Sequence, residues 1–515
     1  MNNAAEPTGA RWRAAFAGLA AVAGGTGAAE IVAVVMAPSA SPLFAAGSLV
    51  IDASPLWLKT LVIGLFGTAD KVVIIVCVAL LVAGVGALAG VLECSRPPWG
   101  RALVALVGVV GMLAAVTRAG AGVVSVLPSA AAVVVGIVLL AVLTRQSGAV
   151  ASASGGRNQG MARRTFLVTS GLTAGVGILT AVTGRITASG IQAAEAARRV
   201  FTLPAPAVSA PPIPTGATLG IPGIAPLVTS NRDFYRIDTA LLVPSIDPAS
   251  WSLKVTGMVD HDVTITFDEL LALPLEERYT TLACVSNEVG GGLIGNALWL
   301  GYPIRHLLAE AGPKPGADMV LSRSSDGFTA GTPLEALTDD RNAILAVAMN
   351  GAPLPPEHGF PVRMVVPGLF GYVSATKWVT ELTLTRFADD AAYWTQHGWS
   401  ARGPVKLSSR IDTPRGFSSV SPGRVMVAGV AWSQHVGVSR VEVQVDDGSW
   451  EDAELAEAIS ADTWVQWSYS WDASPGRHQV TVRATDANGR VQTAARADVV
   501  PDGATGRHSV LVDVD

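Results

Sequence analysis

Charged residues are almost missing from several long stretches of residues 1–200, and this distribution constrains the fold more than any other feature. A helix that crosses a bilayer needs about 20 apolar residues. Five stretches qualify, the last being the least apolar: 14–36, 72–92, 102–117, 123–143 and 166–183. Only 15% of the whole chain is charged, against roughly 25% in ordinary soluble proteins. Residues 1–200 are therefore expected to form an all-α transmembrane bundle of about five helices.

Arginine clusters predict the orientation of this bundle, because cytoplasmic loops carry an excess of basic residues. The clusters are Arg11 and Arg13, Arg96 and Arg101, and Arg145, Arg157, Arg163 and Arg164. Five spans with a cytoplasmic N-terminus place all three on the inner side. Everything after residue 185 then lies outside, so we expect a multi-pass protein of the cell membrane. The lone Arg118 departs from this rule.

Two features of the apolar region need separate interpretation. The stretch Trp57–Phe66 is followed closely by Asp70 and Lys71, which favours an interfacial or re-entrant segment. Glu30 lies inside the first expected span, where a carboxylate is costly and is by default a functional candidate. Its position near the outer end of that span also allows it to reach interfacial water.

The rest of the chain has the composition of a soluble protein. Residues 201–227 contain seven prolines and predict an extended, semi-rigid spacer, which we assign as a linker over 201–229. Residues 230–405 mix short strands with helices such as 267–273 and 304–311, which favours an α+β domain.

The final domain, 406–515, is expected to be an all-β immunoglobulin-like sandwich. Four short strands separated by turn residues carry this interpretation, at 425–432, 439–445, 465–471 and 478–484.

Composition excludes several classes of function. A net charge of −5 without a basic patch argues against nucleic acid as a partner. All seven histidines lie at or beyond His261, so the apolar region cannot hold a bis-histidine haem. No CxxC, CxxCH, HExxH or Walker motif occurs. The glycines at 290–295 formally match GxGxxG, but they follow a Cys-Ser-Asn loop rather than a strand that opens onto a helix.

Cys284, in the sequence TLACVSNEVGG, is the only cysteine after residue 200. A free cysteine is commonly a small buried hydrophobe. A thiolate is also a soft metal ligand, and the adjacent glycines would let backbone approach a bound group closely. The spacing alone leaves both interpretations open.

Three further stretches, read together with TLACVSNEVGG, resemble the sulfite oxidase family of molybdopterin-dependent enzymes. They are 231–239 with 243–248, 355–368, and 371–378. The resemblance extends over roughly 230–515 and includes a C-terminal part similar to the family's dimerisation domain. It implies a molybdenum–molybdopterin cofactor, one molybdenum per chain, and a homodimer.

The resemblance also implies roles for particular residues. Cys284 would be the catalytic residue and the protein ligand of molybdenum. The remaining expected cofactor-binding residues are Tyr235, Arg236, Asp238, Thr239, Ser324, Asp326, His358, Arg363, Ser374 and Lys377. Arginine and lysine suit the phosphate of the pterin, although each of these residues taken alone would more often form a surface ion pair.

Departures from the family pattern bear on the substrate. Members that oxidise sulfite carry arginines after the cysteine motif, whereas here Asn287 is followed by Glu288, whose carboxylate would repel an anion. Asp-Thr-Ala at 238–240 also replaces an Arg-Asn-His cluster, and the lysine motif is one residue longer. The sequence therefore predicts the cofactor more firmly than it predicts sulfite.

The expected function is oxygen-atom transfer on a small substrate, sulfur compounds included, at the outer face of the membrane. Electrons would pass to or from a separate donor or acceptor protein, and membrane lipid would surround the anchor. Two alternatives stay open: a sulfoxide-type reductase of the same fold, and a non-enzymatic, membrane-anchored binding protein.

The segment Ala162–Leu167, with Arg163 and Arg164 ahead of an apolar run, resembles a twin-arginine export signal placed inside the chain. The other interpretation is a pair of positive-inside arginines. Export of a folded domain would suit a protein that receives its cofactor in the cytoplasm.

Overall fold

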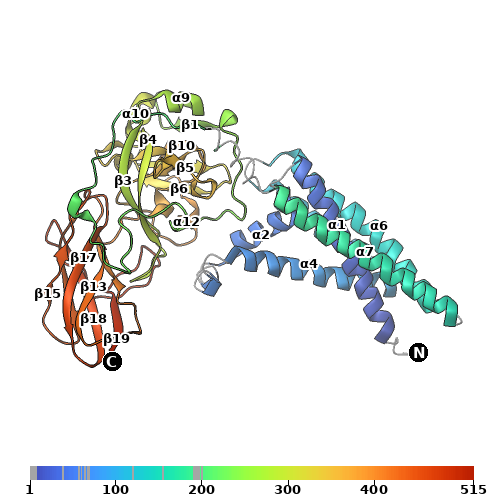
Figure 1. The fold of residues 1–515 in the computed structure, drawn as a ribbon. Helices are drawn as coiled ribbons and strands as arrows, with labels where there is room; N and C mark the ends of the chain where they lie inside the picture. The colour runs from blue at the N-terminus through green and yellow to red at the C-terminus, as the bar shows by residue number, and fades with distance from the viewer. Residues whose placement is uncertain are drawn as a thin grey trace. The chain divides into compact units, whose positions relative to one another are not determined.

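The computed structural model describes residues 8–36, 40–55, 58, 61–62, 65–66, 70–118, 121–152, 156–188, 198 and 201–515 (Figure 1). The chain divides into two compact units. The first comprises Met1–Gln192 with Ala240–Val243, and the second comprises Ala193–Thr239 with Pro244–Asp515.

The first unit is helical, as the apolar stretches predict. Its helices are α1 (Thr8–Met36), α2 (Pro42–Ala53), α4 (Asp70–Ser95), α5 (Trp99–Val116), the short η3 (Val123–Val126), α6 (Leu127–Ser152) and α7 (Gly156–Ala188). Four described segments are long and apolar enough to cross a membrane: Ala10–Met36, Lys71–Ser95, Trp99–Val116 and Val123–Gly148. The expected fifth span falls in α7, where the side chains of 182–188 lie outside the description, so it stays a prediction. The expected interfacial segment Trp57–Phe66 also falls largely outside the described residues.

Glycines allow α1 to pack closely against its neighbours (Figure 1). A Cβ atom built on Gly18 would lie 2.0 Å from the carbonyl oxygen of Gly86 in α4, and one on Gly27 would lie 2.7 Å from that of Gly177 in α7. Small residues that let backbones approach are typical of helix packing inside membranes, where dispersion and shape complementarity replace the hydrophobic effect.

Glu30 and Arg118 of the helical unit both have polar partners. Glu30 is buried, at 2% exposure, and its Oε1 accepts a hydrogen bond of 2.6 Å from the Ser41 hydroxyl. The interpretation in which Glu30 reaches interfacial water is therefore wrong, because the protein itself covers this carboxylate. Arg118 forms an ion pair of 2.8 Å with Asp52, which gives a counter-charge to the arginine that departs from the positive-inside pattern.

The second unit begins with an α+β domain built on two five-stranded sheets. The first sheet has the order β2-β1-β10-β5-β6, with β1 (Ser252–Gly257) parallel to β10 (Val379–Thr385). Its other strands are β2 (Val263–Thr266), β5 (Met319–Ser324) and β6 (Thr329–Pro333). The second sheet has the order β3-β4-β7-β8, with β9 beside β7. Its strands are β3 (Glu276–Ala283), β4 (Ile294–Pro303), β7 (Ile344–Met349), β8 (Ala352–Pro353) and β9 (Arg363–Val365).

Two helices of this domain confirm the sequence expectations. Helix α9 (Phe267–Ala272) begins at a capping box, in which Thr266 Oγ1 accepts from the Glu269 backbone N–H and the Glu269 carboxylate accepts from that of Thr266. Helix α10 (Ile304–Ala311) ends at Gly312, whose φ of +69° is a left-handed conformation that glycine adopts without strain.

The C-terminal domain is a sandwich of two sheets, as expected. One sheet has the order β11-β13-β17-β16 and the other β12-β19-β18-β14-β15. The strands are β11 (Ser408–Thr413), β12 (Ser418–Val420), β13 (Gly423–Trp432), β14 (Val438–Val445), β15 (Glu451–Asp452), β16 (Glu454–Leu455), β17 (Val465–Ala473), β18 (Gly476–Asp486) and β19 (Ser509–Val514). Strands β13, β14, β17 and β18 cover the four stretches predicted from alternation, and their inward residues surround Trp467.

The proline-rich segment is extended but is not the free spacer that its composition predicts. The Ala207 N–H donates to Leu275 O at 2.8 Å, and the Leu219 N–H donates to Gln466 Oε1 at 2.9 Å. Its later part accepts from the sandwich, since Trp464 Nε1 donates to Leu227 O at 2.9 Å. Proline removes backbone donors but leaves carbonyl acceptors, so the segment can lie as a strap along both domains of this unit.

Trp467 should dominate the stability of the sandwich because its side chain is fully buried. We expect Trp467→Ala to lower the free energy of unfolding by about 3–5 kcal/mol, through lost apolar burial and a cavity. Thermal unfolding of the purified protein measures this. Val491→Ala, at a side chain 51% exposed, should leave the transition unchanged, and an equal effect of both substitutions would contradict the assignment of Trp467 to the core.

Candidate functional site

Cys284 lies in a tight loop that joins β3 to β4. Its backbone N–H donates to Leu293 O at 2.9 Å, and its carbonyl accepts from the Asn287 N–H at 3.1 Å. The Asn287 side chain closes the loop, because its Oδ1 accepts from the Leu293 N–H at 2.7 Å. Since the glycines of this loop lie between two strands, with no helix opening onto them, the dinucleotide-binding geometry is absent from residues 276–303.

The Cys284 thiol is buried, at 9% exposure. Burial raises its pKa, whereas hydrogen bonds from the backbone and hydroxyl of Ser286 and from the backbone of Val285 lower it. Burial is the larger effect, so the pKa of the thiol stays above its ordinary value. The donors would stabilise a thiolate once a positive centre binds to the sulfur.

Asp238 joins two of the expected cationic residues. Its Oδ2 accepts from Lys377 Nζ at 2.6 Å and from Arg236 Nε at 3.1 Å. The side chains of Asp238 and Lys377 are only 5% and 10% exposed. Lys377 Nζ also donates to Glu357 O at 3.1 Å and lies 4.7 Å from the ring centroid of Trp378, so the ammonium is held in one place.

Arg363 and His358 form the neighbouring part of the cluster. Arg363, at 6% exposure, starts β9 and lies with its guanidinium 5.0 Å from the ring centroid of Trp299. Its Nη1 donates to His358 O at 3.2 Å. His358 Nε2 donates to Asn231 O at 2.9 Å, and a carbonyl acceptor fixes the proton of the neutral imidazole on this nitrogen.

Electrostatics show that these residues lie close enough to act on one another. The pKa of His358 falls from 6.5 to about 4, mainly through burial and also through the charges of Arg363, Lys377 and Arg236, while the hydrogen bond to the Asn231 backbone opposes the shift. Burial raises the pKa of Tyr235, with the charge of Cys284 adding to this and that of Arg363 opposing it. Tyr235 thus lies within electrostatic reach of both the thiol and the cationic cluster.

The structure gives the remaining expected residues local roles. The Ser374 hydroxyl is fully buried and donates to Phe370 O at 3.0 Å. Ser324 and Asp326 shape the turn between β5 and β6, where the Asp326 N–H donates to Ser324 Oγ at 3.4 Å. Thr239 is half-buried beside Asp238. The β5–β6 turn reaches the lysine segment through a hydrogen bond of 2.9 Å from the Ser325 N–H to Trp378 O.

Sequence reasoning missed the aromatic residues that support this cluster. The ring of Phe234 packs against Tyr235, Trp299 and His358, with centroid distances of 5.2, 5.7 and 5.7 Å. Trp299 is buried and comes from β4. Asn231 is the first residue of the first motif, and its backbone carbonyl accepts the hydrogen bond from His358. Every residue has such a carbonyl, so the sequence does not show this role.

With this geometry, comparison with known families gives a consistent result. The oxidoreductase molybdopterin binding domain matches residues 240–394, and a bacterial Ig domain matches residues 408–482. An uncharacterized oxidoreductase, YuiH, of Bacillus subtilis is 34% identical over 165 residues, which are 32% of this chain and 80% of that protein. The chain belongs to the sulfite oxidase family of molybdopterin-binding oxidoreductases.

Longer members of the sulfite oxidase family match over part of their length. The mitochondrial sulfite oxidase of Drosophila melanogaster is 29% identical over 320 residues, covering 51% of this chain and 55% of that protein. The chain thus spans about half the length of this relative. The sulfane dehydrogenase SoxCD of Paracoccus pantotrophus aligns with a TM-score of 0.49 and 23% identity, over 57% of this chain and 84% of that one; this likeness says nothing about function.

The residues of this chain fit the cofactor that the family binds. Molybdenum takes soft thiolate ligands, and Cys284 offers a buried sulfur surrounded by donors. The pterin carries a phosphate, and the cluster around Asp238 supplies the cationic groups of Arg236, Arg363 and Lys377, with the neutral His358 beside them. Guanidinium and ammonium groups form charge-assisted hydrogen bonds with phosphate, so these side chains suit such a cofactor.

The depressed pKa of His358 predicts a pH dependence in cofactor-free protein. A buried imidazole that stays neutral contributes stability above pH 6.5, and this contribution is lost as the pH falls towards about 4. The loss at full protonation is about 3 kcal/mol. His358→Gln keeps an N–H for Asn231 O but cannot titrate. Its melting temperature should therefore fall less between pH 7 and pH 4.5 than that of the wild type.

The control for this measurement is His261→Gln, at an exposed histidine, which should follow the wild type. Identical acid sensitivity in the His358→Gln protein and the wild type would contradict a neutral, buried His358.

Proposed function

We propose that this protein is a molybdenum–molybdopterin oxidoreductase that transfers an oxygen atom to or from a small substrate. The observation that carries the proposal is the buried Cys284 thiol, held by hydrogen-bond donors and within electrostatic reach of Tyr235, which also feels the charge of Arg363. When bound, the cofactor supplies the two-electron chemistry between Mo(VI) and Mo(IV), and the protein supplies ligation, orientation and electrostatics.

Each side chain then has a defined task. Cys284 would be the catalytic residue, as the sulfur ligand of the metal, and the donors of Ser286 and Val285 would stabilise its thiolate once the metal is bound. Arg363 and Lys377 would bind the pterin and its phosphate, with Asp238 fixing the lysine and Arg236 in place. His358 would donate or accept through Nδ1, since Nε2 is committed to Asn231 O.

Further support would come from Tyr235, Thr239, Ser324, Asp326 and Ser374, the remaining residues that the family pattern assigns to the cofactor. Ser374 and the Ser324–Asp326 turn would do so through the backbone that they fix, because Ser374 Oγ donates to Phe370 O and Ser324 Oγ accepts from the Asp326 N–H. Tyr235 would contribute an apolar ring with a neutral hydroxyl, consistent with the raised pKa of its phenol.

Electrons would travel to a separate protein. Among the described residues, no group of three or more His, Cys, Asp or Glu side chains could hold a second metal, and no CxxCH haem motif occurs in the sequence. The proposed partners are therefore a small-molecule substrate and a separate electron donor or acceptor.

The loop after Cys284 favours a neutral substrate over sulfite. Residues 285–293 contain no arginine or lysine, and Glu288 is exposed there. An anion would meet one carboxylate and no cation from this loop. A sulfoxide-type reductase of the same fold is the second candidate for this reason. A screen of neutral and anionic sulfur compounds with artificial electron donors and acceptors would separate the two directions.

Metal content tests the proposed function directly. Freshly purified protein should contain about one molybdenum per chain, and Cys284→Ser should lose most of it because an alcohol is a poor substitute for a soft thiolate. Cys77→Ser and Cys94→Ser, at exposed cysteines outside this unit, serve as controls and should keep the metal. A folded wild-type protein without molybdenum would refute the proposal.

We further propose that the helical unit anchors the protein in the cell membrane and that the catalytic unit lies on the extracytoplasmic side. Support comes from the four apolar helices and the arginine distribution. The extracytoplasmic side also requires that the apolar part of α7 is a fifth span, which belongs to this proposal. Arg163 and Arg164 are exposed on α7, ahead of its apolar run, where an export machinery could bind them. Contact with membrane lipid and a homodimer through the sandwich are also proposals, the latter on family grounds.

Export can be tested with a substitution that keeps the charge. Replacing both arginines with lysine preserves the positive-inside pattern but removes a twin-arginine signal. The catalytic unit should then stay in the cytoplasm, protected from protease added outside the cells. Arg145→Lys is the matched control and should export normally. Unchanged protease access in the Arg163→Lys/Arg164→Lys protein would exclude the signal.

A further inference from the structure

The immunoglobulin-like domain contacts the Cys284 loop at three successive residues. Arg410 Nη1 donates to Gly291 O at 2.8 Å. The His508 ring lies against Gly290, where a Cβ atom would be 2.3 Å from Nε2. Val289 Cγ2 would lie 3.7 Å from a Cβ atom at Gly506. Hydrogen bonding and van der Waals packing therefore act together on this turn.

Arg410 is itself held rigidly. Its Nε donates to Asp412 Oδ1 at 2.6 Å, and the two side chains are only 12% and 9% exposed. Asp412 Oδ2 accepts from the Ala225 N–H of the proline-rich strap at 2.9 Å. A guanidinium fixed on one side by a buried carboxylate can hold a carbonyl on its other side at little entropic cost.

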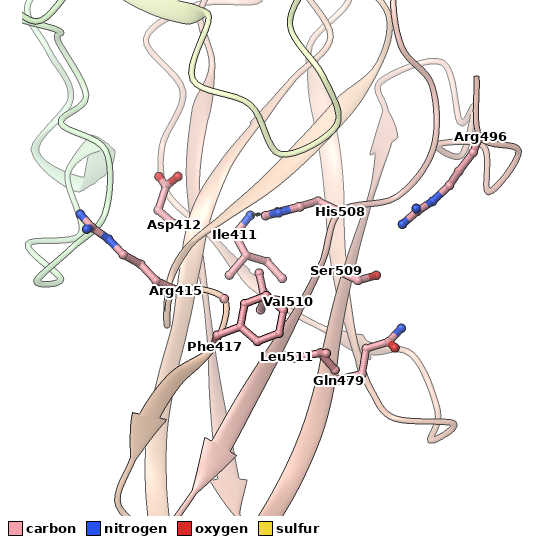
Figure 2. A pocket seen from close by; sticks show the side chains of 11 residues that line it. Ile411, Asp412, Arg415, Phe417, Gln479, Arg496, His508, Ser509, Val510 and Leu511 are labelled. Atoms are coloured by element: carbon pink, nitrogen blue, oxygen red, sulfur yellow. Dashed lines mark hydrogen bonds between the residues drawn. The ribbon is translucent and has the colours of Figure 1, made fainter. Parts of the chain in front are cut away.

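His508 fills the space beside the glycine turn. Its Nδ1 accepts from the Ile411 N–H at 3.0 Å, the dashed line in Figure 2. This bond places the ring in the wall of a cavity of about 430 Å³ that Arg415 and Arg496 also line. Gly290 has φ +82°, a conformation that side chains rarely adopt, and a Cβ atom there would clash with the His508 ring. The close contact between turn and ring therefore requires glycine at this position.

The same domain holds the strand that leads into the loop. The Thr281 N–H, three residues before Cys284, donates to Asp462 O at 3.0 Å. The Thr281 hydroxyl accepts from the Trp464 N–H at 2.9 Å, and its carbonyl accepts from Gln434 Nε2. Both ends of the segment that carries Cys284 are thus fixed from outside the molybdopterin domain.

We propose that Arg410 is a positioning residue that sets the direction of the Cys284 sulfur through its hydrogen bond to Gly291 O. The statement that the sulfur binds a metal rests on the proposed function. The mechanical claim, that the hydrogen bond from Arg410 holds the turn 289–291 in place, does not depend on it. Without this bond the turn 289–291 is released, while the cationic residues around Asp238 stay in place. The pterin should then be retained, and the sulfur should no longer be held in one geometry.

Hydrogen exchange on the purified full-length protein tests the mechanical claim. The variant is Arg410→Met with Asp412→Asn, which removes the donor without leaving a buried charge and keeps an oxygen for Ala225. Exchange in residues 284–293 should be at least about tenfold faster, the effect of losing one charge-assisted hydrogen bond, with β13 and β17 unchanged.

The matched control is Arg477→Met with Asp513→Asn. This pair also has an Nε–Oδ1 distance of 2.6 Å in the same domain, but its arginine is 64% exposed. Among the described residues its hydrogen bonds run to Asp513 and not to the loop. The control should leave exchange in residues 284–293 at the wild-type rate. Unchanged protection of the loop in the Arg410 variant would overturn the proposal.

A general loss of protection in the sandwich would shift the decision to Arg410→Gln. Glutamine can place an N–H near the position of Arg410 Nε, where it can still donate to Asp412, but it has no group at the position of Nη1 to reach Gly291 O. Faster exchange confined to residues 284–293 supports the proposal, and wild-type exchange there overturns it.

Molybdenum X-ray absorption gives a second readout that does not depend on turnover. The Arg410 variant should keep wild-type pterin content per chain but show a weakened or more disordered sulfur shell around the metal. An unchanged sulfur shell would overturn the claim about direction. Wild-type protein without molybdenum would refute the proposed function, while the exchange experiment would still decide the role of Arg410.

Discussion

The hydrogen bonds around Thr281 and Asn296 hold together the parts on which the site depends. Both side chains are fully buried, and Thr281 Oγ1 donates to Asn296 Oδ1 at 3.1 Å. Asn296 Nδ2 donates to Leu227 O of the strap at 2.9 Å, and the Thr281 hydroxyl accepts from Trp464 of the sandwich. Since an unsatisfied buried polar group costs about 1–3 kcal/mol, strand, strap and sandwich are kept together at the point where the chain turns into the Cys284 loop.

The buried positive charges of the site would suit an anionic ligand. Arg363 and Lys377 are nearly removed from water, and burial lowers the pKa of Arg363 to about 10. The aromatic ring of Trp299 and the carboxylate of Asp238 only partly offset the lost hydration. His358 responds by staying neutral. A phosphate-bearing cofactor would complete this balance, which gives a physical reason for the order of motifs that the family shares.

Local patterns predicted the elements well, because the spacing of apolar residues reports on which face of an element is covered. Helix α10 and strands β13, β14, β17 and β18 were all foreseen within a few residues. The packing of the proline-rich strap was not predicted. Its prolines indicate an extended backbone but do not show which groups its carbonyls contact. Glu30 was similarly misplaced: hydropathy gives the depth of a residue along a helix but not that Ser41, eleven residues later, covers it.

The sequence by itself determined the apolar helices, the two domains that follow, and the family, through Cys284 and the ordered motifs around Asp238, His358–Arg363 and Lys377. Only the tertiary structure decided that Trp299 supports Arg363, that Asn231 lends its carbonyl to His358, and that Arg410 holds Gly291 across 119 residues of chain. Such contacts depend on strand register and on the packing of one domain against another. The type of a residue determines which interactions it can form. Which partner it contacts depends on the tertiary structure, which brings distant segments of the chain together.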